Sequence, residues 1–221
     1  MVYRLRLAQT HFFRSVLKPV KLCTLPSLFL FAIGFQSFAD SEWKKVKESK
    51  GVQVFEKKVD KEIAFRGVAT LQGTGEQFLN VLQNTRRWKF WVENLKSGKL
   101  IEKKSDSLRI YRQVISAPFP MKDREAVYES EIKRLSPRTI LVEMKSVNHP
   151  RVKRSKDYVR VEITYTRYRI EDTGNGEIRV TFENLSQAGG KVPKFLIDWA
   201  SRSYPITLLN GIQKEIKLME K

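Results

Sequence analysis

The sequence has few of the residues on which metal sites and many catalytic sites are built. It contains one cysteine and two histidines in 221 residues. One cysteine cannot close an intrachain disulfide, and zinc sites take most of their ligands from cysteine and histidine. The glycine motifs of phosphate loops and dinucleotide-binding folds are also missing. We therefore expect no metal and no cofactor, and thiol or serine–histidine catalysis is disfavoured.

Acidic residues are missing from the first 39 positions. Residues 1–21 hold five arginines and lysines, and residues 22–39 carry no charge and end in Ser37-Phe38-Ala39. A basic n-region (1–21), an apolar h-region (22–39) and small residues at the exit predict a secretory signal peptide over residues 1–39. The protein would then be exported, to the periplasm in a bacterium. The alternative is an uncleaved N-terminal anchor, since the apolar stretch is near the shortest length that spans a bilayer.

The whole chain is also short of acids, with 24 Asp and Glu against 42 Lys and Arg and a net charge of +18. Loss of residues 1–39 would leave 37 basic residues against the same 24 acids. Four basic residues close together are candidates for a patch that docks transiently on a membrane surface: Arg151, Lys153, Arg154 and Lys156. Anionic headgroups attract such residues by about 1 kcal/mol each. A simply soluble basic surface is the alternative, and export argues against a nucleic-acid partner.

No repeat, low-complexity segment or Pro/Ser-rich linker follows residue 40, so residues 40–221 are predicted to form a single domain. Alternating apolar residues and turn clusters predict eight strands. They cover residues 51–57, 62–71, 99–104, 108–116, 126–135, 139–147, 158–170 and 177–185. A phase slip between Tyr165 and Tyr168 predicts a β-bulge, and the cluster 172–176 predicts a hairpin turn.

Helices are predicted at two places. Thr74 and Gln77 form a capping box that opens a short helix, with a second helical piece over 86–92. Pro193 opens a long C-terminal helix that ends near Leu218 and should kink at Pro205. Mostly antiparallel strands with segregated helices give an α+β fold in which the long helix covers one face of the sheet.

Several short motifs along the domain resemble the START (steroidogenic acute regulatory protein-related lipid transfer) domain. Trp43 with Gly51-Val52-x-Val54 resembles its opening strand, and Arg86–Val92 resembles its R-x-x-W-D-x-x-V helix. Residues 118–127 resemble its P-M-x-x-R-D motif, and Gly189–Phe195 resembles the glycine-rich start of its last helix. Two positions depart from these patterns, Lys89 and Glu125, where the family commonly has aspartate.

The resemblance implies a helix-grip fold, in which a curved antiparallel sheet wraps a long C-terminal helix around an internal apolar cavity. Family members bind sterols, phospholipids, ceramides or other apolar ligands, one per domain. The arginine of the P-M-x-x-R-D motif, here Arg124, would point into the cavity to meet a headgroup or a buried acid such as Glu102 or Glu143. The other candidate ligand-binding residues are aromatic: Trp88, Trp91, Tyr128, Phe195 and Trp199.

The leading hypothesis is a monomeric, non-catalytic carrier of a lipid or other apolar molecule. One alternative is an enzyme of the cyclase or aromatase type, with Tyr111, Tyr128 and Tyr165 as the available groups. The other is an interaction module with a filled core and no ligand. His149 is interpreted as a loop histidine, because it stands in a turn-like stretch beside basic residues.

Overall fold

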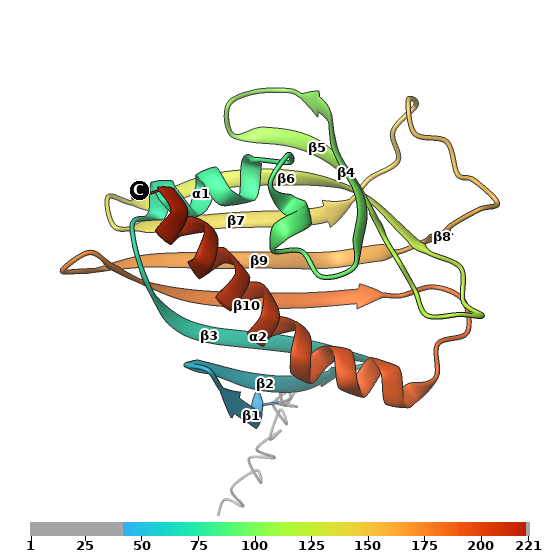
Figure 1. Ribbon diagram of the computed structural model, residues 1–221, viewed down its shortest axis with the longest axis horizontal. Coiled ribbons are helices and arrows are strands. Elements are labelled where there is room, and N and C mark those ends of the chain that lie inside the picture. Colours follow the sequence, from blue (N-terminus) through green and yellow to red (C-terminus); the bar gives the residue numbers. More distant parts are fainter. Residues whose placement is uncertain (1–41, 220–221) are drawn as a thin grey trace, which may run out of the picture. The chain divides into compact units, whose positions relative to one another are not determined.

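A single curved sheet dominates the computed structural model, which describes residues 42–219 (Figure 1). Its strands follow the order β1-β2-β3-β10-β9-β7-β6-β5-β4, and every neighbouring pair is antiparallel. A two-residue strand, β8, pairs in parallel with the start of β6. The strands are β1 Lys44–Ser49, β2 Val52–Val59, β3 Glu62–Gln72, β4 Leu95–Lys103, β5 Leu108–Ile115, β6 Arg124–Ser136, β7 Thr139–Ser146, β8 Val159–Arg160, β9 Glu162–Gly174 and β10 Glu177–Gln187.

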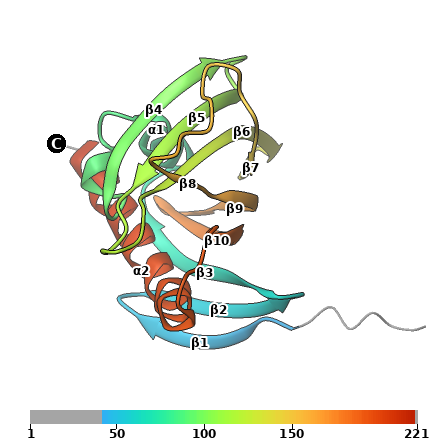
Figure 2. The same cartoon turned by 90° about the vertical axis from the view of Figure 1, so that its right-hand side faces the viewer.

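Three helical elements lie on one face of this sheet (Figures 1 and 2). They are α1 Gly75–Gln83, the 3-10 turn η1 Trp88–Phe90, and α2 Lys194–Met219. The connection through α1 and η1 carries the chain from β3 in the middle of the sheet to β4 at its far edge. This arrangement confirms the α+β helix-grip fold.

The capping box predicted for the first helix is present. Thr74 Oγ1 accepts from the Gln77 N–H at 3.2 Å, and the Gln77 side chain accepts from the Thr74 N–H at 2.7 Å. These bonds satisfy two donors that a helix start leaves without partners. The helix buries Phe78, Val81 and Leu82 against the sheet, as their spacing indicates.

The long helix lies close to the sheet where β3 has a glycine. A Cβ at Gly67 would lie 2.8 Å from the Pro205 Cβ, so a larger residue there would push the helix away. The helix continues through Pro205, and Figure 1 shows its axis bending along its length. Its buried apolar residues begin at Pro205, and the whole stretch from Lys194 to Ala200 has no buried side chain.

Several strand predictions are confirmed, and others need correction. A bulge is present where β9 pairs with β10, but it lies just before the predicted place between Tyr165 and Tyr168: Leu185 faces Tyr165 and Ser186 faces Ile163, which leaves Thr164 as the extra residue. The predicted strand 158–170 is wrong as a single element, because it divides into β8 and β9. The edge strand β1 was not predicted, since its alternating lysines leave it only one partly buried apolar residue, Val46.

The predicted signal peptide, residues 1–39, lies outside the described residues. Between residues 42 and 219, no helix has the length and apolar character needed to cross a membrane.

Candidate functional site

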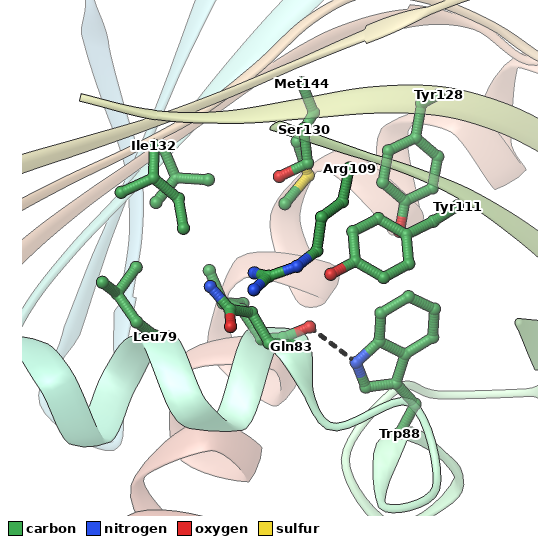
Figure 3. Close-up of a pocket in the computed structure, with 11 residues that line it drawn as sticks. Leu79, Gln83, Trp88, Arg109, Tyr111, Tyr128, Ser130, Ile132 and Met144 are labelled. Carbon is green, nitrogen blue, oxygen red and sulfur yellow. Dashed lines mark hydrogen bonds between the residues drawn. The ribbon is translucent and has the colours of Figure 1, made fainter. Parts of the chain in front are cut away.

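A small pocket lies between α1 and the sheet strands β5, β6 and β7 (Figure 3). Its apolar lining includes Leu79, Trp88 and Met144, and its polar lining includes Gln83, Arg109 and Ser130. The cavity volume is about 10 Å³, which is room for about one water molecule. The lipid-sized tunnel that we expected from the resemblance is therefore not open in this structure.

Aromatic side chains fill the space that such a tunnel would need. Trp88 packs on Tyr111 with ring centroids 5.2 Å apart, and Tyr111 packs on Tyr128 at 5.8 Å. Trp88 is fixed further, because its Nε1 donates to the Leu82 carbonyl at 2.9 Å. A second group of rings continues the seam under α2, with Tyr168 on Phe182 at 5.0 Å and Phe182 on Tyr204 at 6.0 Å.

Three tyrosine side chains belong to this aromatic seam: Tyr128, Tyr168 and Tyr204. Burial raises the pKa of Tyr204 to about 12 and the pKa values of Tyr128 and Tyr168 well above 10.0. Among the described residues, the indole N–H of Trp91 is the one buried side-chain nitrogen or oxygen without a hydrogen-bond partner. Native cores rarely leave buried polar atoms unpaired, so the Trp91 N–H needs an explanation.

Arg109 brings a positive charge to the same pocket. It stands opposite Ser130 in the pairing of β5 with β6, and in Figure 3 its guanidinium points toward Gln83 and the Tyr111 hydroxyl. Burial raises the pKa of Tyr111, and the nearby Arg109 charge partly opposes that rise. No carboxylate of residues 42–219 lies within ion-pair distance of Arg109.

The structure places Arg124 outside this pocket. It is the first residue of β6, and its guanidinium folds back to donate to the Lys122 carbonyl at 2.6 Å. The two acids we had considered as partners have others: Glu102 contacts His149 at 2.9 Å, and Glu143 binds Lys133 and Arg167. The suggested ion pair of Arg124 with Glu102 or Glu143 is therefore wrong.

The buried ion cluster forms on the next residue instead. Glu125 is 2% exposed and accepts from Arg112 Nε at 2.6 Å and from Arg160 Nε at 2.9 Å. The Arg112 guanidinium also lies over the Tyr158 ring. This cluster joins β5, β6 and β8 near the end of the sheet and lies apart from the pocket.

The remaining aromatic candidates divide between the interior and the surface. Trp88 and Tyr128 line the pocket, and Trp91 is buried against α2, where its backbone would meet a Cβ on Gly211 at 3.1 Å. Phe195 and Trp199 are 68% and 56% exposed, so the expectation that Trp199 faces the interior does not hold in this structure. Both flank an open groove of about 350 Å³ at the start of α2, beside Lys47 and Arg202.

The predicted basic patch lies in the long segment between β7 and β8. Four exposed basic residues belong to this segment: Arg151, Lys153, Arg154 and Lys156. His149 in the same segment is not free, because Glu102 holds its Nε2. In the described part of the chain, no group of three or more His, Cys, Asp or Glu could hold a metal ion.

The fold and this interior can now be compared with known proteins. The family profile of the START domain matches residues 37–218. The chain belongs to the START domain family. Phosphatidylcholine transfer protein of Mus musculus is 24% identical over 188 residues, which span 82% of this chain and 83% of that protein. An uncharacterized protein of Pseudomonas aeruginosa is 21% identical over 192 residues, spanning 86% of this chain and 94% of that protein.

Solved START structures show the same fold. Human StAR-related lipid transfer protein 5 superposes with a TM-score of 0.73 at 21% identity, over 84% of this chain and 90% of that chain. A STAR-related lipid transfer protein from Xanthomonas axonopodis superposes with a TM-score of 0.70 at 21% identity, over 79% of this chain and 98% of that chain. Membership of this family supports lipid binding or transfer as the general activity of the START domain described here.

Sequence reasoning missed three residues of this interior: Arg109, Tyr168 and Tyr204. Arg109 alternates with Tyr111 on one strand, and Ser130 alternates with Tyr128 on the next. This alternation indicates that the two residues of each strand share a face of the sheet. Only the register between the two strands shows that Arg109 and Tyr111 lie beside Ser130 and Tyr128.

Proposed function

We propose that this START domain binds one lipid or other apolar molecule between the sheet and α2 and carries it without a catalytic step. The observation that supports this best is the polar content of the aromatic seam. Three tyrosine hydroxyls and the Arg109 guanidinium lie along the seam, and the buried Trp91 N–H has no partner among the described residues. Leaving a buried donor unpaired costs about 1–3 kcal/mol, and the polar end of an amphipathic ligand would bind groups of this kind.

Room for such a ligand has to come from movement, and α2 offers a place for it. Its first two turns bury no side chain, whereas its second half packs through Ile206, Leu209 and Ile212. The preceding loop contains Gly189 and Gly190 with φ of +68° and +63°, a conformation that favours glycine. We propose that the first turns of α2 and this loop open as a lid while the second half stays in place.

The free energy for opening would come from burial of the ligand's hydrocarbon. Each buried CH₂ contributes about 0.8 kcal/mol, so one long acyl chain offsets the loss of many aromatic contacts at the lid. In this proposal the open state is stable only with the ligand present, and the pocket of about 10 Å³ between α1 and the sheet belongs to the closed state.

The chemistry of the lining supports binding without catalysis. The pocket contains neither a carboxylate nor a histidine. Burial raises the pKa values of Tyr111 and Tyr128, so both hydroxyls stay protonated near neutral pH and are poor general bases. Nothing in this lining favours a cyclase-type reaction over carriage.

One end of the domain has the composition of a membrane-docking surface. Phe119 in the β5–β6 loop is 98% exposed, and Lys122 of that loop donates to the Lys156 carbonyl at 2.8 Å. The loop before α2 approaches the same region, since a Cβ on Gly189 would lie 2.7 Å from Val159. Exposed Phe195 and Trp199 follow on α2. Aromatic and basic side chains together favour the headgroup region of an anionic bilayer.

Export remains part of this proposal. A leader over residues 1–39 would place the carrier outside the cytoplasm, where it could act between membranes. N-terminal sequencing of the protein from the periplasmic fraction of a bacterial host tests this, with a mature chain that begins near Asp40 as the expected result. An intact Met1 end in the membrane fraction would favour the anchored alternative instead.

A vesicle-to-vesicle transfer assay tests the carrier function. The full chain should accelerate movement of a fluorescent lipid from donor to acceptor vesicles in a saturable way. Tyr128→Phe removes a hydroxyl of a pocket-lining residue and keeps the ring, so it should slow transfer about threefold to tenfold, the effect of one hydrogen bond of about 1 kcal/mol. Tyr165→Phe, on an outward-facing ring beside Arg167, is the matched control and should transfer normally. Transfer no faster than the spontaneous rate would refute the proposal.

The interior volume supports one competing function. A cavity of about 10 Å³ would also suit a ligand-free interaction module with a filled core. Such a module would gain stability from Tyr128→Phe and would show no lipid-dependent behaviour.

A further inference from the structure

Arg109 differs from the other arginines that reach into this domain. Arg112 and Arg160 share the buried carboxylate of Glu125, and Arg87 holds the buried Glu215. Arg109 is partly buried on β5 and has only neutral groups beside it in the pocket. Among the described acids, Asp106 has a pKa that Arg109 helps to lower, but that carboxylate is 95% exposed and its pKa is lowered chiefly by Lys103.

The groups around Arg109 share one chemical property: each can donate a hydrogen bond. The Gln83 amide, the Ser130 hydroxyl and the Tyr111 hydroxyl all line the same pocket (Figure 3). A site with a cation, three donors and no carboxylate is complementary to an anion. A guanidinium in particular binds the two oxygens of a carboxylate or a phosphate through two parallel N–H groups.

A cationic headgroup would fit this site poorly. Recognition of a quaternary ammonium uses open aromatic faces, with the cation within about 6 Å of a ring centroid. Here Trp88, Tyr111 and Tyr128 pack on one another, so their facing sides are occupied. The Arg109 charge would also repel a second cation.

We infer that the lipid carried by this domain has an anionic polar end, a carboxylate or a phosphate monoester, that Arg109 holds between its guanidinium nitrogens. This inference rests on the proposed carrier function and adds the ligand class to it. The acyl chain would then extend from the pocket along the aromatic seam beneath α2. The preference would separate this chain from its mouse relative, whose name specifies phosphatidylcholine.

Native mass spectrometry of the full chain after incubation with defined lipids tests this inference. The probes are vesicles of phosphatidylcholine that contain dioleoyl phosphatidic acid, the same vesicles with oleic acid, and phosphatidylcholine vesicles alone. The wild type should show one anionic lipid per chain, favoured about tenfold or more over phosphatidylcholine at equal content. An adduct with oleic acid alone or with phosphatidic acid alone would support the inference and identify the anion.

Variants of Arg109 assign the preference to the site. Arg109→Gln should lose the preference for the anionic lipid and still bind a neutral lipid, and Arg109→Lys should retain part of it. Arg179→Gln removes an exposed arginine of β10 and should behave as wild type. Thermal melting checks that each variant is folded.

The outcomes separate the two proposals. A wild type that binds phosphatidylcholine as readily as the anionic lipids would overturn the ligand class and leave the carrier function intact. Retention of the preference in Arg109→Gln would also overturn the inference. A wild type that binds none of the lipids would overturn the carrier function together with it.

Discussion

The buried Glu125 carboxylate should be among the most important single charges for the stability of this domain. It lies between two guanidiniums, at 2.6 Å from Arg112 Nε and 2.7 Å from Arg160 Nη2. Glu125→Gln keeps the shape of the side chain and removes its charge. The variant leaves two arginines close together, and the side chain of Arg160 is only 7% exposed.

The size of the effect follows from how well each arginine can find another partner. Arg112 is 22% exposed and can turn toward water while it stays against the Tyr158 ring. Arg160 is enclosed, and its other acceptor is the Val152 carbonyl at 3.5 Å. Removal of one partner from a buried ion pair typically costs about 3–5 kcal/mol. For a domain of this size, that loss lowers the melting temperature by about 6–20 °C.

Urea unfolding followed by circular dichroism measures this loss, and the same strand supplies the control. Glu129 is 18% exposed and pairs with two lysines, at 3.1 Å and 3.9 Å. Glu129→Gln should cost no more than about 1 kcal/mol, since pairs at the surface contribute little. If Glu125→Gln unfolds at the same urea concentration as Glu129→Gln, the central place of Glu125 in the ion cluster is refuted.

Three further predictions concern packing, pH and the membrane surface. Gly98→Ala places a Cβ 2.5 Å from the buried Trp88 ring and should cost about 1–3 kcal/mol in urea unfolding. Gly75→Ala is the control, because its Cβ comes closest to Cδ1 at the end of the Ile140 side chain, at 2.9 Å, and an equal loss there would contradict the explanation. The pKa of Asp123 is lowered chiefly by Lys96, and that of Glu143 chiefly by Lys133. A carboxyl whose pKa is lower in the folded state stabilises the fold above its unfolded-state pKa, and this stability is lost as pH falls through the folded-state pKa. The melting temperature should therefore drop between about pH 5 and pH 3. A melting temperature that stays constant over this range would argue against these pairs. The double variant Phe195→Ser, Trp199→Ser should bind anionic vesicles more weakly in a flotation assay, with little change in melting temperature. Leu135 is 52% exposed near the β6–β7 turn, and Leu135→Ser should bind as wild type does. Equally weak binding by the double variant and by Leu135→Ser would count against docking through α2.

Local features of the fold could be predicted because short-range chemistry decides them. The Thr74–Gln77 capping box and the β9–β10 hairpin each depend on residues within a few positions of one another. The change in alternation indicated a bulge between Tyr165 and Tyr168, whereas the extra residue is Thr164, so the alternation located the bulge only approximately. By contrast, the split between β8 and β9 depends on pairing of β8 with β6, more than thirty residues earlier, which alternation alone does not show.

The site was harder to predict, because it depends on where along a strand a residue lies. Arg124, Tyr128 and Ser130 lie at alternating positions of β6, which place side chains on one face of the sheet. It was therefore reasonable to expect that the Arg124 side chain would point into the interior. It is the first residue of β6, however, and its side chain bonds to its own loop. Arg109 enters the pocket because the register places it opposite Ser130. The volume left between sheet and helix follows from the packing of many distant aromatic side chains, and no sequence pattern reports it.

The central claim is that this domain carries a lipid, and the protein as cells make it tests that claim most directly. The full chain would be purified without detergent, weighed by native mass spectrometry, and weighed again after extraction with organic solvent. Our account predicts a 1:1 mass increment that disappears on extraction, and the extracted molecule would identify the ligand. A mass equal to that of the bare chain, unchanged after incubation with mixed-lipid vesicles, would contradict the account and favour a ligand-free interaction module.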